Sequence, residues 1–185
     1  MEAIFCLPYP EYNIASYFQK YFEKKDGYSV AVPLSRQQKG FDLLMYNVKT
    51  KKTLSFQVKS SRAWSSDKPT RGFRYSSWFG RFEPNKYVDY YVFSILYAKS
   101  PSDKKRLDKI NPGKWWSSRI IVFDNLEITA LFDNLKTKKG EPERFFYFGF
   151  NEKPEDIFIT RGLPLKSFKE NLLASQIKNI RDRLQ

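Results

Sequence analysis

The side chains in this sequence that could carry out chemistry are carboxylates, amides and lysines, because the chain contains no histidine. Without histidine, Ser-His-Asp and Cys-His catalysis and histidine-ligated zinc sites are excluded. One short stretch carries an amide, Gln57, and an amine, Lys59, two residues apart. If this stretch is a β-strand, both side chains point to the same side, because successive residues alternate. The sequence therefore predicts a polar pair on one strand face.

An acidic partner for this pair is predicted by the hairpin that surrounds the turn 48–52. The stretches on either side of the turn are strand-like, and we expect Asn47 and Lys52 to pair directly where the hairpin closes. In that register Asp42 lies opposite Gln57 on the same face. A turn of odd length would put the two residues on opposite faces. The predicted site therefore depends on the register of this hairpin.

A fourth candidate, Glu11, belongs to a helix predicted over residues 11–25. Pro10 can start this helix, and an apolar stripe follows at helical spacing: Ile14, Ala15, Phe18, Tyr21 and Phe22. Glu11 lies four residues before Ala15 and so extends the stripe. A carboxylate aligned with apolar residues needs a partner, and we expect a metal or a lysine of the sheet beneath to provide one.

The remaining elements are predicted to complete an α/β fold. Further strands are expected at residues 28–33, 87–97, 119–123, 144–150 and 157–160, a short helix near 126–135, and an amphipathic helix that includes apolar residues from 165 to 184. Residues 61–86 mix Arg, Ser, Trp, Phe and Gly without a clear period. They are predicted to form a long functional loop.

The order of a helix with Glu11, a strand, a strand with Asp42 and a strand with Gln57-x-Lys59 resembles the PD-(D/E)XK, or restriction-endonuclease-like, nuclease superfamily. The resemblance covers roughly residues 11–62, and it looks most like the Gln-x-Lys branch, which includes homing and restriction-like endonucleases. It rests on three motifs: Gly27-Tyr28 with Val30, Val32 and Pro33; Phe41-Asp42-Leu43-Leu44; and Phe56-Gln57-Val58-Lys59-Ser60-Ser61-Arg62.

This resemblance implies a restriction-endonuclease-like core, in which a central mixed β-sheet is flanked by helices and a C-terminal amphipathic helix is added. We expect one domain over residues 1–185, because the chain has enough apolar residues for one sizeable core and is short for two. The motif core would span about 11–62, and a C-terminal elaboration about 100–185.

The resemblance also implies an activity, a Mg²⁺-dependent endonuclease that hydrolyses DNA phosphodiester bonds, with Mn²⁺ as a substitute metal. In the family the Asp and the third-strand acidic or amide residue bind the metal, and the Lys positions or activates the attacking water. These roles would fall on Asp42, Gln57 and Lys59, with Glu11 as an auxiliary carboxylate and metal ligand. One site per chain favours a homodimer or a higher symmetric oligomer for cutting a duplex.

Gln57 departs from the commonest family pattern, which has Asp or Glu at this place. The change removes one negative charge from the metal shell, so metal affinity should be lower. The same change fits a non-catalytic DNA- or RNA-binding protein with a degenerate nuclease fold, which stays open as an alternative.

The charge balance favours a polyanionic partner, DNA first, because 33 Lys and Arg face 20 Asp and Glu, a formal net charge of +13. After the motif, arginines are interleaved with aromatic residues, a mixture suited to gripping phosphates and stacking at bases. The predicted DNA-binding residues are Arg62, Arg71, Arg74, Trp78 and Arg81. Two alternatives remain: these aromatics are core and the arginines are ordinary surface, or the chain is a basic interaction protein without nucleic-acid chemistry.

Other features favour a cytoplasmic protein that is not inserted in a membrane. Cys6 is the single cysteine, so no disulfide can form within the chain. The N-terminal residues do not resemble a secretory signal, and the longest apolar run, 87–97, is interrupted by Asp89 and is too short to span a bilayer. No phosphate-binding glycine loop or dinucleotide fingerprint is present.

Overall fold

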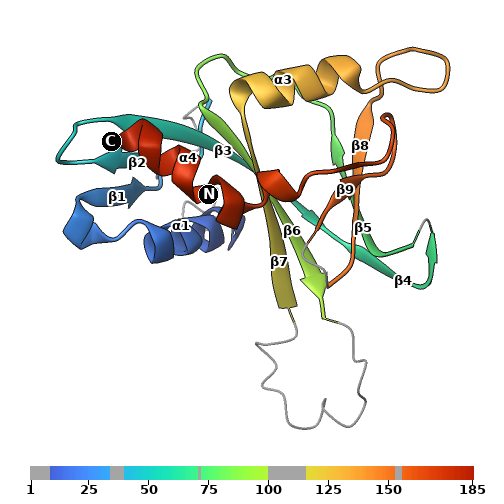
Figure 1. Ribbon diagram of the computed structural model, residues 1–185, viewed down its shortest axis with the longest axis horizontal. Helices are drawn as coiled ribbons and strands as arrows, with labels where there is room; N and C mark the ends of the chain where they lie inside the picture. Colours follow the sequence, from blue (N-terminus) through green and yellow to red (C-terminus); the bar gives the residue numbers. More distant parts are fainter. Residues whose placement is uncertain (1–8, 34–39, 71, 100–115, 153–155) are drawn as a thin grey trace, which may run out of the picture.

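The computed structural model describes residues 9–33, 40–70, 72–99, 116–152 and 156–185. Two five-stranded β-sheets form its framework (Figure 1). Sheet A contains, in spatial order, β1 (Tyr28–Ala31), β2 (Leu43–Asn47), β3 (Thr53–Arg62), β6 (Tyr90–Ala98) and β7 (Trp116–Asp124). Sheet B contains, in spatial order, β10 (Lys166–Ser167), β9 (Phe158–Ile159), β8 (Phe145–Phe150), β5 (Phe73–Gly80) and β4 (Trp64–Thr70).

Three α-helices and two short 3₁₀ helices accompany these sheets in the described part of the chain. They are α1 (Tyr9–Tyr21), α3 (Asn125–Asn134), α4 (Leu173–Leu184), η1 (Lys24–Asp26) and η3 (Lys169–Asn171). Sheet A is mixed, because β3 pairs with β6 in parallel while its other strand pairs are antiparallel. The predicted α/β class and mixed sheet are therefore confirmed.

The β2–β3 hairpin closes as expected, and its turn shows why. Asn47 is buried, and its backbone nitrogen donates to the carbonyl of Lys52 at 3.0 Å. The Asn47 side-chain oxygen accepts a hydrogen bond from the backbone nitrogen of Lys49 at 2.9 Å, which stabilises the turn locally. Lys51 takes the left-handed conformation, with φ of 61°.

One face of sheet A is covered by α1 and α4, which lie side by side (Figure 1). Phe18 of α1 packs on Phe56 of β3, with ring centroids 4.8 Å apart, and Phe56 stacks on Tyr90 of β6 at 5.4 Å. Ile180 and Leu184 of α4 are completely buried in the same apolar cluster. This cluster is called the helix-side core below.

The opposite face of sheet A packs on sheet B and on α3, and these layers enclose a second apolar cluster, the inter-sheet core. Phe93 of β6 lies between the sheets, with its ring centroid 5.4 Å from that of Phe146 of β8. Asp124 and Glu127 start α3 with a reciprocal capping box, at 2.8 and 2.9 Å. Helices were expected on both faces, but a second sheet covers much of this one.

The prediction of a long loop over residues 61–86 is wrong, because the stretch contains the strands β4 and β5. In β5, Tyr75, Ser77 and Phe79 are buried in the direction of the inter-sheet core, while Ser76 and Trp78 between them are exposed. Aromatic residues therefore occupy both faces of the strand, and this hides the two-residue period by which a strand is recognised.

Two predicted helices are shorter than expected. The first ends at Tyr21, and a separate turn, η1, follows before Gly27, whose φ is 96°. The last begins at Leu173, because Phe168 belongs to the inter-sheet core whereas Leu173 belongs to the helix-side core. The chain therefore crosses from one face of sheet A to the other between these two residues.

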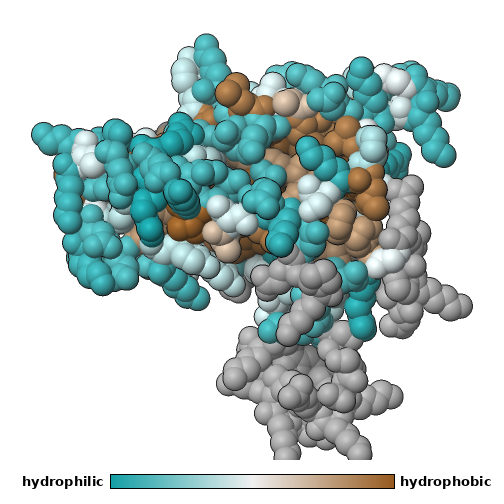
Figure 2. Space-filling model, viewed as in Figure 1, coloured by the Kyte–Doolittle hydropathy of each residue, from teal (hydrophilic) through white to brown (hydrophobic). Residues whose placement is uncertain are grey.

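An apolar hollow of about 430 Å³ opens beside α3, between this helix and the segment that leads to η3. Its walls include Leu131, Leu163 and Phe168, and Figure 2 shows apolar side chains reaching the surface in this region. Among the helices of the described residues, none combines the length and apolar character needed to cross a membrane.

Candidate active site

The β2–β3 hairpin has the register that the sequence predicted over residues 43–46 and 53–56. Leu43 pairs directly with Phe56, and this pair ends the ladder. The backbone nitrogen of Asp42 also donates to the carbonyl of Phe56, at 2.8 Å, so Asp42 lies beside Phe56 as in a β-bulge. The ladder therefore does not continue to the predicted pair of Asp42 with Gln57.

The Asp42 carboxylate is fixed by the edge of β3. Its Oδ2 atom accepts a hydrogen bond from the backbone nitrogen of Val58 at 2.7 Å. The ladder between β2 and β3 has ended before Val58. The Asp42 carboxylate therefore accepts the hydrogen bond that a backbone carbonyl of β2 would accept if β2 were longer. Asp42 is half-buried, and its orientation is determined by this bond.

Gln57 and Lys59 point away from the helix-side core, because Phe56 and Val58, which alternate with them along β3, are buried in it. Both side chains are half-buried. The Lys59 ammonium lies 5.0 Å from the centroid of the Phe82 ring, a contact in which the cation meets the negative face of the ring. Lys59 is thus held at the margin of the inter-sheet core without being enclosed by it.

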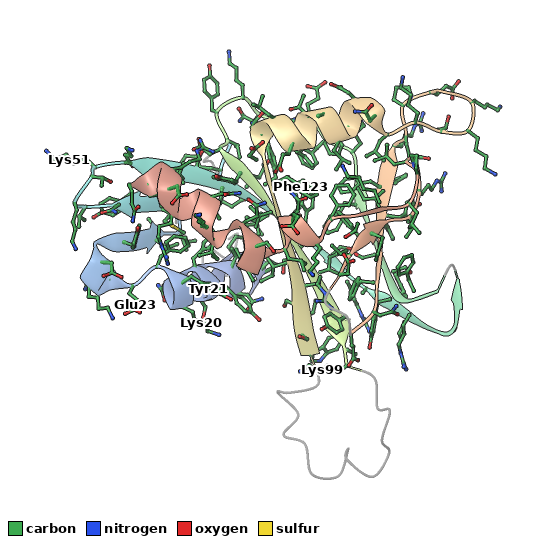
Figure 3. All side chains as sticks on the ribbon, in the orientation of Figure 1. Lys20, Tyr21, Glu23, Lys51, Lys99 and Phe123 are labelled. Atoms are coloured by element: carbon green, nitrogen blue, oxygen red, sulfur yellow. The ribbon has the colours of Figure 1, made fainter. Side chains whose placement is uncertain are left out.

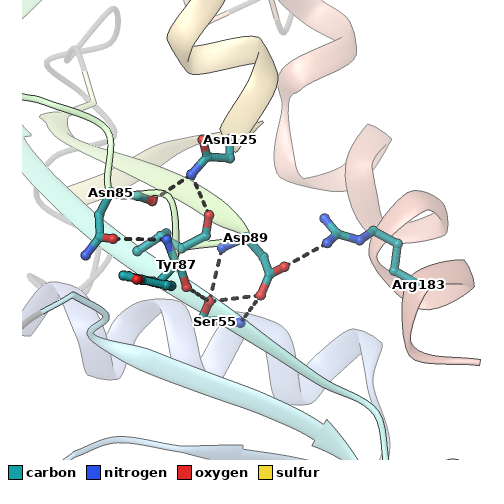
Figure 4. Close-up of polar contacts among 7 residues, drawn as sticks. Ser55, Asn85, Tyr87, Asp89, Asn125 and Arg183 are labelled. Atoms are coloured by element: carbon teal, nitrogen blue, oxygen red, sulfur yellow. Dashed lines mark hydrogen bonds and ion pairs between the residues drawn. The ribbon is translucent and has the colours of Figure 1, made fainter.

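The segment 81–89, between β5 and β6, borders this group. Phe82 packs on Tyr91 and Phe132, with centroids 5.1 and 5.0 Å apart. A Cβ atom at Gly40 would lie 3.0 Å from the amide nitrogen of Asn85, so the chain two residues before Asp42 touches the same segment. Figure 4 shows how Asn125 fixes this segment to α3, by donating to the carbonyls of Asn85 and Val88, each at 2.7 Å.

The donor atoms of this group are one carboxylate and one amide oxygen. Among the described residues, no cluster of three or more His, Cys, Asp or Glu could hold a metal ion, and no ion pair joins Lys59 to Asp42. Mg²⁺ prefers oxygen ligands and commonly keeps several waters with one or two carboxylates. The Asp42 carboxylate and the Gln57 amide supply oxygen atoms of the kind that Mg²⁺ prefers.

Glu11 is not brought into this group. α1 packs on the opposite face of sheet A, where Phe18 meets Phe56. Its first turn is anchored at the far edge of the sheet, because the Asn13 amide donates to the Ser118 hydroxyl of β7 at 3.1 Å. β3 and β6 separate β7 from β2, a distance of roughly 14 Å at ~4.8 Å per strand. Glu11 is half-buried there, with its Oε2 atom shielded from solvent.

The predicted DNA-binding residues are distributed over several surfaces. Arg81 lies on the Phe82 side of the group, because its guanidinium sits 5.5 Å from the ring of Phe132, which also packs on Phe82. Arg62, at the end of β3, lies 5.4 Å from the ring of Trp116 of β7.

Two others belong to sheet B. Trp78 is exposed on its outer side, and Arg74 is half-buried at the start of β5, where its backbone nitrogen donates to Asn151 at 2.9 Å. Arg71 lies outside the described residues.

A second carboxylate, that of Asp89, lies beside β3. In the sequence, Asp89 stands out only because it interrupts the apolar run 87–97. Its Oδ2 atom accepts hydrogen bonds from the backbone nitrogen and the hydroxyl of Ser55, at 2.8 and 2.9 Å (Figure 4). Its Oδ1 atom pairs with Arg183 of α4 at 2.7 Å. Asp89 therefore caps β3 on the β6 side, as Asp42 does on the β2 side.

Arg183 also covers the Tyr90 ring, 4.9 Å from its centroid. Burial raises the pKa of the Tyr90 hydroxyl, although the neighbouring guanidinium acts in the opposite direction. An aspartate placed directly before a strand that is buried along almost its whole length is the signal by which this network could have been anticipated.

No protein-family model matches the chain, and no curated protein matches its sequence. The site is therefore described by its own geometry.

Proposed function

We propose that this protein is a Mg²⁺-dependent endonuclease of the restriction-endonuclease-like type, which hydrolyses DNA phosphodiester bonds at Asp42, Gln57 and Lys59. The observation that carries the proposal is that the Asp42 carboxylate accepts a hydrogen bond from the backbone nitrogen of Val58, the residue between Gln57 and Lys59. The net charge of +13 supports a polyanionic substrate.

In this proposal the Asp42 carboxylate and the Gln57 amide oxygen would hold the metal. A bound Mg²⁺ would polarise the scissile phosphate and make its bound water a better nucleophile. Asp42 is oriented in advance by the Val58 backbone nitrogen. Lys59, held against Phe82, would orient the attacking water and stabilise negative charge on the phosphate. Cutting both strands of a duplex would take two chains, as in a symmetric dimer.

Two variants test this proposal without removing the packing that the side chains provide. Asp42→Asn keeps an oxygen that can accept from Val58 but loses the charge, and Lys59→Met keeps a long chain against Phe82 but loses the amine. Each should reduce Mg²⁺-dependent cleavage of labelled duplex and branched DNA by more than about 100-fold. DNA binding and thermal stability should stay close to those of the wild type.

Asp26→Asn and Lys52→Ala change exposed residues of the same chemical types and serve as matched controls, with cleavage expected at the wild-type rate. The proposal is wrong if purified wild-type protein leaves every substrate intact with Mg²⁺ and Mn²⁺, or if cleavage survives in both site variants.

A non-catalytic nucleic-acid-binding protein is the second candidate. The observation that favours it is that the Asp42 carboxylate already serves the backbone of β3, beside an uncharged Gln57. Basic residues also lie far from the group, such as Lys51 at the tip of the β2–β3 hairpin and Lys99 at the end of β6 (Figure 3). This candidate predicts salt-dependent binding in the wild type and in both variants, with an affinity that falls roughly 10³-fold between about 50 and 200 mM salt if about six phosphates are contacted.

A further inference from the structure

We infer that the outer face of sheet B binds single-stranded nucleic acid by stacking bases on exposed aromatic rings. The inference extends the proposed function by naming the form of the nucleic acid that is bound. It rests on the proposed function, because that function supplies the argument for a nucleic-acid partner.

The aromatic face is produced by strand alternation. Trp78 of β5 pairs directly with Tyr147 of β8, so both rings lie on the side that points away from the inter-sheet core. Trp64 of β4 pairs with Ser76, two residues before Trp78, and therefore lies diagonally beside it, at roughly 7–8 Å between Cα atoms. Phe145 packs edge to face with Trp78, with centroids 5.2 Å apart. We call Trp64, Trp78, Phe145 and Tyr147 the aromatic platform.

The platform is open to solvent. The exposed fractions are 64% for Trp64, 46% for Trp78 and 39% for Phe145, unusually large for rings of this size. Small residues lie between the rings on the same face, Ser76 and Gly80. A Cβ atom at Gly80 would meet only Phe145, at an ordinary 3.9 Å. Flat surfaces are thus available to an incoming base.

The chemistry of the face favours a base over an apolar protein surface. Its exposed apolar groups are aromatic rings, which stack on every base. Arg161 lies 5.2 Å from the centroid of Tyr147, and more than half of its side chain is exposed. The nearby carboxylate of Glu143 is buried and pairs with Arg161 at 2.9 Å. These contacts leave the face neutral to basic, as a phosphate backbone requires.

A shallow hollow of about 610 Å³ extends from Phe145 of the platform to Phe82, the ring that Lys59 contacts. Its lining includes Phe145 of the platform together with Arg81, Phe82 and Arg144, with Glu83 and Glu143 as its acidic members. The Lys59 ammonium lies 5.0 Å from the Phe82 ring. A strand stacked on the platform could thus continue past the two arginines toward Lys59. Substrates with a single-stranded segment beside a duplex, such as flaps and branched junctions, fit this path.

The test measures binding in chelator, so that the result does not depend on cleavage. Oligothymidine and oligouridine of about 12 nucleotides are titrated into wild type, Trp64→Ala, Trp78→Ala and the double variant, followed by fluorescence anisotropy. Each single substitution should weaken binding about 10-fold, and the double variant about 100-fold. Affinity for a blunt duplex should change less than two-fold, and Trp78→Phe should recover most of the loss.

Trp116→Ala is the matched control, because Trp116 is similarly exposed, at 45%, but lies in β7 of sheet A. Single-strand affinity that is unchanged in the double variant, or that falls equally for the duplex, would overturn the inference. The inference would also be overturned if the double variant binds single strands normally but no longer self-associates in analytical ultracentrifugation. The face would then be an interface between protein chains. If the protein binds single strands as expected but never cleaves DNA, this inference holds and the proposed nuclease function is wrong. If the protein cleaves DNA and neither tryptophan substitution changes the cleavage, the nuclease function holds and this inference is wrong.

Discussion

Asp42 and Gln57 show how much a single charge matters at the proposed site. The Asp42 carboxylate is already polarised by the backbone nitrogen of Val58, and Gln57, the residue before Val58, carries no charge. Metal affinity in oxygen-ligand sites depends on the number of charged ligands. The identity of residue 57 should therefore determine the metal concentration at which the protein works.

Replacing this amide by a carboxylate, Gln57→Glu, should move the Mg²⁺ dependence of cleavage to about 10-fold lower concentration, because a second charged ligand joins Asp42. The measurement is the cleavage rate as a function of Mg²⁺ concentration. Gln19→Glu adds the same charge at an exposed position of α1 and should leave the curve unchanged. An identical Mg²⁺ dependence in wild type and Gln57→Glu would show that residue 57 does not contact the metal.

The way in which elements pack explains what the sequence could predict and what it could not. The register of the β2–β3 hairpin was predictable because Asn47 and Lys52 pair locally. The parallel pairing of β3 with β6 was not, because the residues that it joins are far apart in sequence. The position of Glu11 was missed for a similar reason. The position of Glu11 on the apolar stripe predicts which side of α1 is buried. It does not predict which face of sheet A this helix covers.

Sheet B has its own packing constraint at Gly149, on the outer face of β8. A Cβ atom there would lie 2.7 Å from both the Phe73 ring and the Thr160 side chain. Gly149→Ala should therefore lower the free energy of unfolding by about 1–3 kcal/mol through overpacking, measured by urea denaturation. Gly80→Ala adds the same methyl group on β5, where it would meet only Phe145 at an ordinary 3.9 Å, and should be close to neutral. Equal stability of the two variants would contradict this account of the packing.

At the scale of the whole molecule, β6 joins the two cores. Tyr90 and Tyr91 are successive residues, and Tyr90 belongs to the helix-side core while Tyr91 belongs to the inter-sheet core. Burial raises the pKa of both hydroxyls above the ordinary value of about 10. The folded state thus favours the neutral form of each hydroxyl, and ionisation of either one opposes the fold.

Stability should accordingly be retained below about pH 10 and lost as the pH rises through the raised values, since the unfolded chain releases these protons more easily. Tyrosinate absorbance of the buried rings and loss of circular dichroism should change together, in one alkaline transition. Tyr90→Phe should shift this transition to higher pH, whereas Tyr87→Phe, at an exposed position, should leave it in place. Two separate transitions would show that the cores unfold independently.

The parallel pairing of β3 with β6 has a consequence for synthesis on the ribosome. The hairpin of β2 and β3 can form soon after it emerges, but the other edge of β3 stays unpaired until β6 has been made, after β4 and β5. An unpaired edge of this kind invites pairing with another nascent chain. Expression at lower temperature, or with chaperones that shield strand edges, should therefore raise the yield of folded protein.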